Sequence, residues 1–544
     1  MKRIFTAFIF ILSFCLFIGI IFNNTDQFRF EDLLITKDEY EVLKASHNKS
    51  VQDMLDAISF NNTPLIFDEL TDRWFYSLSA DAAAINPSVG FNGAEKNIRI
   101  AFSQQIIPGE PTEFIAYNES EYKTYTLVIT TLPLAQINCD KEFLSIQNNV
   151  PETDLSIDLT EKTFPMQFTL VDNRPNAIQS MVVSNGLIHL HGAGTLHHPK
   201  KSFRITLLEK TAGKDQQENK TALLGMRQDG DWLLYPAYND QEKIRNVFST
   251  NLWYTSCADD NSFNLIYGNQ YRFVELFLNN RYWGLYALGF PIDTKQMRIF
   301  PDNQGHYEEF LFKQKAFGPK TENLDPGYDG FIIQHEMSEP DLNNGILILK
   351  MYFSQLKNGA AGRFWHNDEL NVIDIWLFTK LGQGYDTVRI PGMTKNMMVA
   401  IKKSDNGRKI LFAPWDMDIY WGNINDQTAK NMTIPYALSP DDNSYEMTVN
   451  PVSILRETDP DVNEKIRERY AALRSAGWSD RKIDEMLDGF EQDIYTSGAY
   501  HRDMERWPDG SYQDPQIGLS IFREYVHARL KSMDSYINGL QINE

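Results

Sequence analysis

The chain has 544 residues, of which 42% are hydrophobic and 13% aromatic, so it is globular and has enough apolar material for roughly three to four domains. It carries 52 Lys and Arg against 73 Asp and Glu, a formal net charge of -21. This balance, and the lack of a basic tract, argue against a nucleic-acid partner.

The amino-terminal segment has the pattern of a membrane anchor. Lys2 and Arg3 precede an apolar run from Ile4 to Phe22, which is long enough to cross a hydrocarbon core of about 30 Å. No small-x-small cleavage motif follows, which favours an uncleaved signal anchor over a removed signal peptide. We therefore expect residues 1–25 to hold the chain in the cell membrane by one span, with the bulk of the chain extracytoplasmic. If the segment is cleaved, the protein is secreted.

Two cysteines, Cys139 and Cys257, follow the apolar segment. Outside the cytoplasm they could form one disulfide, but two buried free thiols fit a chain of this size equally well. The sequence contains no CxxC motif, and the adjacent His197 and His198 do not suit one zinc ion.

The next two segments differ in periodicity. Residues 26–73 have apolar residues at helical spacing, which predicts a helical stalk or linker. Residues 74–131 contain the alternating runs NIRIAF, EFIAY and YTLVITT, which predict a small β-sandwich-like domain used for spacing or binding. The residues at helical spacing in the first segment are Leu43, Val51, Met54, Leu55 and Ile58.

Residues 132–300 are rich in strands. In HLHGAGTLHHPKKSFRITL, a glycine-bearing turn precedes a strand whose alternation puts Phe203, Ile205 and Leu207 on one face. The same count puts Lys201 on this inner face and Lys200 on the wetter face. A lysine on an inner face behind a small-residue loop suits a contact with phosphate, whereas the alternative is a lysine whose stem packs along the surface.

Two further patterns complete this region. DWLLYPAYNDQEKIRNVFSTNLW predicts a strand, a turn at Asn239 and Asp240, and a helix on which Arg245 is a structural ion-pair partner. YRFVELFLNNRYWGLYALGFPID predicts two strands joined by a tight hairpin at Asn279 and Asn280.

Residues 301–544 have mainly helical periodicity. MYFSQLKN begins one helical stretch, NVIDIWLFTKLGQGYD ends another at glycines, and long amphipathic runs with charge pairs fill the carboxyl third. Asp386 emerges into a loop after the second helix, and Asn396 follows ten residues later.

The segment RKILFAPWDMDIYWGN runs from an apolar strand into two carboxylates, Asp416 and Asp418, among aromatic residues. Buried carboxylates require a cation, and two Asp at i and i+2 can reach one hard divalent ion through oxygen. The alternative is that the aromatic residues belong to the core and the two Asp cap a turn.

The order of these features suits phosphoryl transfer. A small-residue loop and a lysine on a strand-rich lobe precede a loop Asp, an Asn and an Asp pair on a helical lobe. Phosphoryl transfer requires cationic neutralisation of the phosphates and a carboxylate that orients the attacking hydroxyl.

Five segments resemble the CotH kinase family, the spore-coat-protein-H-like atypical protein kinases, over about residues 130 to 540. HGAGTLHHPKKSFRITL is similar to that family's RGNSS-then-KKSYR element, and DWLLYPAYNDQEKIRN to its aspartate-then-RN helix. FLNNRYWGLYAL is similar to its NGxYxGxY hairpin, EEFLFKQK to its short segment ending in lysine, and KNMMVAIKKSDNGRKILFAPWDMDIYWGN to its hN-then-PWDxD element.

The resemblance implies an α+β, bilobal, atypical protein-kinase-like fold, with a strand-rich N-lobe at 132–300 and a helical C-lobe at 301–544. It implies that Lys201 contacts the phosphates of ATP and that Asp386 is the catalytic base or orienting carboxylate. It also implies that Asp416 is the main Mg²⁺ or Mn²⁺ ligand, with Asp418 and Asn396 in support.

The chain departs from the family at several positions. His191 and Ala193 replace the Arg and Asn of the loop, so phosphate contacts there would depend on backbone amides, at Gly192 among others, and on the Thr195 hydroxyl. Phe290 replaces a glutamate after the hairpin, and the following Pro291 has no N–H for a nucleotide base. The loop between Asp386 and Asn396 is also longer than in the family.

Three functions remain open. The first is an extracytoplasmic membrane-anchored kinase that phosphorylates serine or threonine of serine-rich surface or coat proteins. The second is an inactive kinase-like protein with a structural or coat-assembly role. The third is an adhesin built on the sandwich near residues 74–131.

Overall fold

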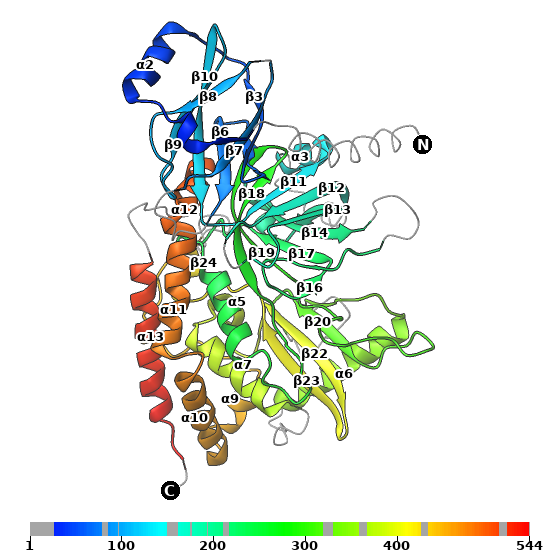
Figure 1. Cartoon of the computed structure of the whole chain (residues 1–544). Coiled ribbons are helices and arrows are strands. Elements are labelled where there is room, and N and C mark those ends of the chain that lie inside the picture. Colours follow the sequence, from blue (N-terminus) through cyan, green and yellow to red (C-terminus); the bar gives the residue numbers. More distant parts are fainter. Residues whose placement is uncertain are drawn as a thin grey trace.

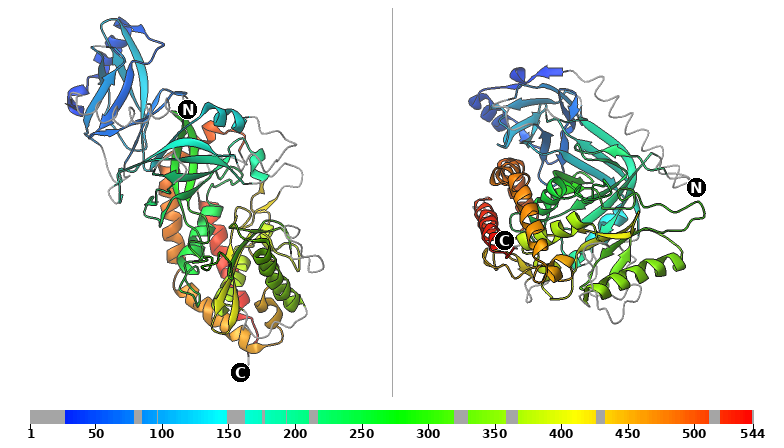
Figure 2. Two further views of the ribbon diagram at one scale, coloured as in Figure 1. Left: turned by 90° about the vertical axis from the view of Figure 1, so that its right-hand side faces the viewer. Right: turned by 90° about the horizontal axis from the view of Figure 1, so that it is seen from below.

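The structure is a computed structural model with a mixed α+β architecture. Three parts follow one another in space (Figures 1 and 2): an amino-terminal β-unit, a closed barrel, and a carboxyl-terminal part of helices and one larger sheet. The expected anchor at residues 1–25 lies outside the described residues, and no helix within the described ranges is long and apolar enough to cross a membrane. The described residues are 27–78, 85–95, 97–148, 162–174, 177–192, 194–209, 217–318, 330–357, 367–425, 433–510 and 519–542.

The β-unit consists of two sheets that enclose one core. Their strand orders are β1-β7-β3-β4 and β5-β6-β10-β9-β8, with β2 paired to β10. Phe60, Trp74 and Phe114 pack together in this core. The elements are β1 (Gln27–Arg29), η1 (Phe30–Leu33), α2 (Lys37–Ser46), β2 (Asn48–Lys49), β3 (Leu55–Phe60), β4 (Thr63–Pro64), β5 (Ile66–Asp68), β6 (Arg73–Ser77), β7 (Ser88–Gly93), β8 (Arg99–Phe102), β9 (Thr112–Tyr117) and β10 (Glu121–Thr130).

The helical prediction for residues 26–73 is wrong over most of that range. Only α2 is an α-helix there, and a capping box between Thr36 and Glu39 closes its first turn. Leu55 and Ile58 are buried in strand β3, because sheet pairing and not helical spacing decides which of these apolar residues meet the core. The strands predicted between 74 and 131 are confirmed as β8, β9 and β10.

The second part is a seven-stranded closed barrel of order β11-β12-β13-β14-β17-β19-β18, closed by parallel pairing of β11 with β18. The predicted inner face of β14 is confirmed, since Phe203, Ile205 and Leu207 are completely buried. The elements are β11 (Leu134–Cys139), α3 (Lys141–Asn148), β12 (Phe164–Val171), β13 (Met181–His191), η2 (Gly194–His197), β14 (Ser202–Leu208), β15 (Thr221–Ala222), β16 (Gln228–Asp229), β17 (Asp231–Tyr235), β18 (Tyr271–Leu278) and β19 (Arg281–Gly289).

Local features of the barrel agree with the sequence in part. The hairpin between β18 and β19 turns at Asn279 and Asn280, both in the left-handed conformation with φ of 47° and 59°. Cys139 and Cys257 are free thiols. The placement of Lys200 on a wetter face is wrong, because Lys200 and Lys201 precede β14 and both are buried.

The third part combines a four-stranded sheet, of order β21-β20-β22-β23, with helices. Helix α7 ends before Gly382, and the predicted helices of the carboxyl third are confirmed as α10, α11 and α13. Asp386 lies in the short helix α8 and not in an open loop. The elements are α5 (Arg245–Ser256), β20 (Phe310–Gln314), β21 (Phe331–Ile333), α6 (Glu339–Lys357), α7 (Glu369–Leu381), α8 (Tyr385–Val388), β22 (Met397–Ser404), β23 (Gly407–Pro414), β24 (Ile424–Asn425), β25 (Thr433–Ile434), α9 (Pro451–Leu455), α10 (Pro460–Ser475), α11 (Asp480–Phe490), η3 (Glu491–Thr496), α12 (Ala499–Arg506) and α13 (Ser520–Asn538).

One core unites α5 with this third part. Phe248 of α5 packs with Trp421 and Phe522, and the core continues to one face of the sheet at Phe412 and Val399. Because α5 follows directly on barrel strand β17, this core fixes the barrel against the sheet and helices.

A buried ion pair ties the barrel to helix α12. Lys200 Nζ donates to Asp503 Oδ1 at 2.7 Å and to the carbonyls of Pro236 and Leu285 at 2.7 and 2.6 Å. The Leu285 N–H also donates to Asp503 Oδ1 at 2.9 Å. Gly284 permits this approach, since its φ is +121° and an added Cβ would lie 2.3 Å from Asp503 Oδ1.

We expect Lys200→Met to lower the free energy of unfolding by up to about 3–5 kcal/mol, because it removes the nearer of two buried cations from the Asp503 carboxylate and leaves only Lys243, at 3.7 Å. Lys200→Met/Asp503→Asn should lose less, since the amide oxygen can still accept from the Leu285 N–H. Urea unfolding followed by fluorescence measures both. Equal losses in the two variants would contradict the role of the ion pair.

Candidate active site

The Asp416 and Asp418 turn follows strand β23 and is held by two asparagines from the segment around α5. Asn239 Nδ2 donates to Asp418 Oδ2 at 2.9 Å, and the Met417 N–H donates to Asn246 Oδ1 at 2.9 Å. Asp416 itself is left-handed with a φ of 59°, a conformation that Asp tolerates better than most residues and that is often found at functional sites. Hydrogen bonds with Asn239 and Asn246 therefore fix both the backbone of the turn, at Met417, and the side chain of Asp418.

Asp386 lies beside this turn, and donors occupy both of its oxygens. Lys395 Nζ lies 2.6 Å and Asn396 Nδ2 3.1 Å from Oδ2, while Asn425 Nδ2 lies 3.2 Å from Oδ1. The same Asn396 amide lies 3.5 Å from the backbone oxygen of Asp416. The structure thus brings together Asp386, Asn396 and Asp416, three of the residues that the sequence selected.

The two carboxylates of the turn carry unfavourable electrostatics. Burial, followed by the charge of Asp416, raises the pKa of Asp418 well above its usual range, although the hydrogen bond from Asn239 opposes this. Burial also raises the pKa of Asp416, even though its carboxylate reaches solvent, because surrounding protein displaces much of the bulk water. Ionisation of both carboxylates at once is therefore unfavourable, and a cation would relieve this.

Lys313 of β20 supplies positive charge opposite Asp416. Burial lowers the pKa of Lys313 to about 8, and the charge of Asp416 acts against that shift. Its ammonium lies 4.4 Å from the centre of the Trp415 ring. The charges of Lys315 and Arg204 lower the pKa of Lys313 further, although Arg204 is itself paired with Asp231.

The donor set suits a hard divalent cation that shares its coordination with phosphate. Asp416, Asp418 and the Asn396 amide offer oxygens, and Mg²⁺ is commonly bound by one or two carboxylates together with substrate phosphates and water. Within the described ranges, no group of three or more His, Cys, Asp and Glu side chains is placed to hold a metal ion. A cation bound here would therefore take part of its coordination shell from the phosphates of a substrate.

Lys201, which the sequence predicts to contact phosphate, makes its described hydrogen bonds within its own turn. Its ammonium donates to the carbonyls of Leu196 and His198 at 2.6 and 2.5 Å, which closes the turn that contains η2. Burial lowers the pKa of Lys201 to about 8. At the start of this turn Gly192 has a φ of 108°, while the Thr195 side chain lies outside the described atoms.

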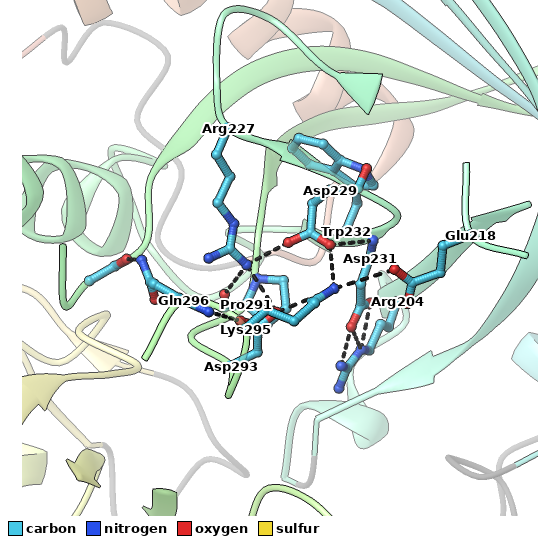
Figure 3. Close-up of polar contacts among 11 residues, drawn as sticks. Arg204, Glu218, Arg227, Asp229, Asp231, Trp232, Pro291, Asp293, Lys295 and Gln296 are labelled. Carbon is cyan, nitrogen blue, oxygen red and sulfur yellow. Dashed lines mark hydrogen bonds and ion pairs between the residues drawn. The ribbon is translucent and has the colours of Figure 1, made fainter. Parts of the chain in front are cut away.

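The segment after β19 borders an ion-pair network, drawn in Figure 3. Arg227 donates to Asp229 at 2.5 Å, to Asp293 at 3.0 Å and to the Pro291 carbonyl at 3.1 Å. Phe290 is completely buried, and the Arg227 guanidinium lies 4.4 Å from its ring centre. Phe290 therefore serves as core, and the charges nearby come from Asp229 and Asp293.

Four residues at this site were missed from the sequence: Asn239, Asn246, Lys313 and Lys395. Lys313 lies within the segment EEFLFKQK, where alternation along the strand puts Lys313 and Lys315 on one face. That alternation was a usable signal. Asn246 is the Asn of the family's RN helix, which was also a usable signal, whereas Asn239 had none, because it acts on a carboxylate 179 residues further along the chain.

Comparison with known proteins gives one result. Residues 188–301 match the family model described as CotH kinase protein. This segment contains Lys200, Lys201, Asn239 and Asn246. A comparison with curated proteins finds no match.

We expect the metal-free protein to lose stability as the pH rises from about 4 towards 8, in part through Asp418. Its folded pKa lies above its ordinary value of 3.8, so the folded state binds more protons than the unfolded state between these two pKa values. The free energy of unfolding therefore falls with rising pH across that window.

Asp418→Asn cannot ionise and should flatten this slope, while Mg²⁺ should flatten it in the wild type only. Thermal unfolding from pH 4.5 to 8.0 in EDTA measures the slope. An unchanged slope in Asp418→Asn would show that this carboxylate is not destabilising.

Proposed function

Because residues 188–301 match the CotH kinase family model, we propose that the chain is a kinase that transfers the γ-phosphate of ATP to serine or threonine hydroxyls of proteins. The observation that carries this proposal is the hydrogen bond of 2.9 Å from Asn239 to Asp418. It joins the family segment to a carboxylate pair far outside it. In this proposal the barrel and the carboxyl-terminal part act as the two lobes of a kinase-like fold, with the site between them.

The acidic side of the site would hold the metal ion. Asp416 and Asp418 would bind Mg²⁺ or Mn²⁺ through carboxylate oxygens, with the Asn396 amide oxygen in support. When bound, the ion would neutralise charge on the phosphates. The hydrogen bonds from Asn239 and Asn246 keep the turn in place before any ligand arrives.

The basic side would bind the phosphates of ATP. Lys313 faces Asp416, and the turn at Gly192 and Thr195 would offer backbone amides and the Thr195 hydroxyl. The sequence assigned the phosphate contact to Lys201, but the described contacts favour Lys313 for it and give Lys201 a role in positioning the turn. Asp386 would orient the acceptor hydroxyl and receive its proton on a carboxylate oxygen.

The substrate class and location remain proposals that rest on the sequence. We propose a serine-rich surface or coat protein as acceptor, because the family resemblance implies it. We propose an extracytoplasmic, membrane-anchored enzyme, because of the apolar run from Ile4 to Phe22. Digestion of intact cells with protease should remove the bulk of the chain, and full protection would contradict this topology.

We expect the purified full-length chain to transfer labelled phosphate from ATP to a serine-rich acceptor or to itself in the presence of Mg²⁺ or Mn²⁺. Asp416→Ala removes a metal ligand and should lower the transfer at least ~100-fold. Lys313→Met should lower it by a similar factor, and Lys201→Met by less.

Lys403→Met is the matched control for the lysine variants. Lys403 lies on the neighbouring strand β22 and pairs at the surface with Glu308, so its loss should leave transfer unchanged. A folded wild-type protein without transfer, or full transfer by Asp416→Ala, would contradict the kinase function. A larger loss in Lys201→Met than in Lys313→Met would restore the phosphate contact to Lys201.

A second candidate is a kinase-like protein without catalysis, which acts in coat assembly or adhesion. Phe290, completely buried in place of the family's glutamate, favours it. This candidate expects that neither nucleotide nor metal raises the thermal midpoint, and that Asp386→Ala/Asp416→Ala supports surface assembly as the wild type does. Stabilisation of about 2.7 kcal/mol at a hundredfold excess of Mg²⁺ and ATP over their dissociation constant, together with phosphate transfer, would exclude it.

A further inference from the structure

Lys395 makes a direct contact with the candidate base that the proposed function does not use. Its ammonium lies 2.6 Å from Asp386 Oδ2, the oxygen that also accepts from Asn396. The other oxygen, Oδ1, accepts from Asn425. An incoming hydroxyl must therefore take the place of one of these donors, or compete with it, to reach Asp386.

The backbone around Lys395 is pinned on both sides. The Lys395 N–H donates to the Thr387 carbonyl at 3.0 Å, and the Asn396 N–H donates to the Gln314 carbonyl at 3.0 Å. Thr394 and Gly318 exchange two backbone hydrogen bonds, of 3.0 and 2.6 Å. The Cα of Lys395 is thus fixed relative to the end of β20, the strand that carries Lys313.

The side chain of Lys395 is less enclosed than that of the structural lysine Lys200. It is 26% exposed, whereas that of Lys200, which forms the structural ion pair, is completely buried. Its ammonium lies 5.8 Å from the centre of the Phe317 ring, and the Arg389 guanidinium lies 5.1 Å from the same ring. Among the donors to Asp386, Lys395 is therefore the one with a long, solvent-accessible stem.

The charge of Lys395 also acts on the metal-binding side. It lowers the pKa of Asp416, whose carboxylate also feels the charge of Asp386. The ammonium therefore lies close enough to influence both the candidate base and the candidate metal ligand. A phosphoryl group in transfer from a metal-bound nucleotide to a hydroxyl at Asp386 must pass between these two carboxylates.

Resting on the proposed function, we propose that Lys395 is a further catalytic residue, whose ammonium leaves Asp386 Oδ2 for the γ-phosphate of bound ATP. The vacated oxygen then accepts the acceptor hydroxyl. In the transfer, the hydroxyl proton goes to Asp386, and the hydroxyl oxygen forms the new bond to the γ-phosphorus. The bond between that phosphorus and the β,γ-bridging oxygen breaks, and its electron pair leaves with ADP. Lys395 keeps its proton throughout and stabilises charge on the transferred group.

The contact with the γ-phosphate separates this role from a structural ion pair, and binding measures it without turnover. Calorimetry with Mg²⁺ compares the non-hydrolysable ATP analogue AMP-PNP with ADP. Lys395→Met should weaken AMP-PNP binding about tenfold or more while ADP changes by less than about threefold, because only the γ-phosphate loses its charged partner. Lys395→Arg should keep the preference for AMP-PNP, and Lys403→Met should resemble the wild type.

Each outcome distinguishes the two proposals. If wild-type protein binds neither nucleotide, the kinase function fails, and the assignment of Lys395 fails with it. If wild-type protein binds both nucleotides and Lys395→Met keeps the wild-type ratio, only the assignment fails. If Lys395→Met does not fold, as judged by its thermal midpoint, the ratio is measured in Lys395→Gln, and an unchanged ratio there equally overturns the assignment.

In the transfer assay, Lys395→Met should lower kcat at least ~100-fold with little change in the KM for the acceptor protein, since the ammonium acts on the transferred group. A purely structural ion pair predicts instead a lower thermal midpoint with kcat retained at temperatures where the variant is folded. That result would also overturn the assignment.

Discussion

The proximity of Asp416 and Asp418 is the constraint around which the site is arranged. Their pKa values are raised by burial and, for Asp418, by the neighbouring carboxylate. The protein therefore holds a local instability that a cation would relieve. The hydrogen bonds of Asn239 and Asn246 hold the turn in place although the two carboxylates destabilise it. The positive φ of Asp416 adds backbone strain. Such an arrangement is typical of a binding site, because a purely structural turn has no need of paired acids.

The rest of the fold supplies the rigidity that this arrangement requires. The core that joins Phe248 to Trp421 and Phe522 fixes α5 behind the acidic turn. The Lys200 and Asp503 pair fixes the barrel to α12. Two adjacent lysines thus have separate structural contacts, since Lys200 reaches across to another element while Lys201 closes its own turn. Charge opposite the acids comes from a third lysine, Lys313.

Much of the local structure could be predicted from periodicity. The strands of the β-unit at NIRIAF, EFIAY and YTLVITT, the inner face of β14, the Asn279–Asn280 hairpin and the long carboxyl-terminal helices are all present. The helical prediction for residues 26–73 was wrong outside α2 because short apolar runs fit helix and strand alike, and for β3 the pairing with β7 decided the outcome. The alternation that placed Lys200 on the wetter face failed because it was extended back beyond the start of the strand, into a turn.

The sequence by itself determined that paired acids follow an apolar strand and that an Asp and an Asn precede them, an order that predicts phosphoryl transfer. Residue types and short spacings can be read directly from the sequence, because the chemistry of a carboxylate does not depend on where its strand lies in the fold. Only the tertiary structure decided which cations face those acids. Asn239 and Lys395 come from loops far apart in the chain, and hydrogen bonds and charge pairs between distant segments leave no periodic trace; strand alternation places Lys313 and Lys315 on one face but does not say that this face meets Asp416.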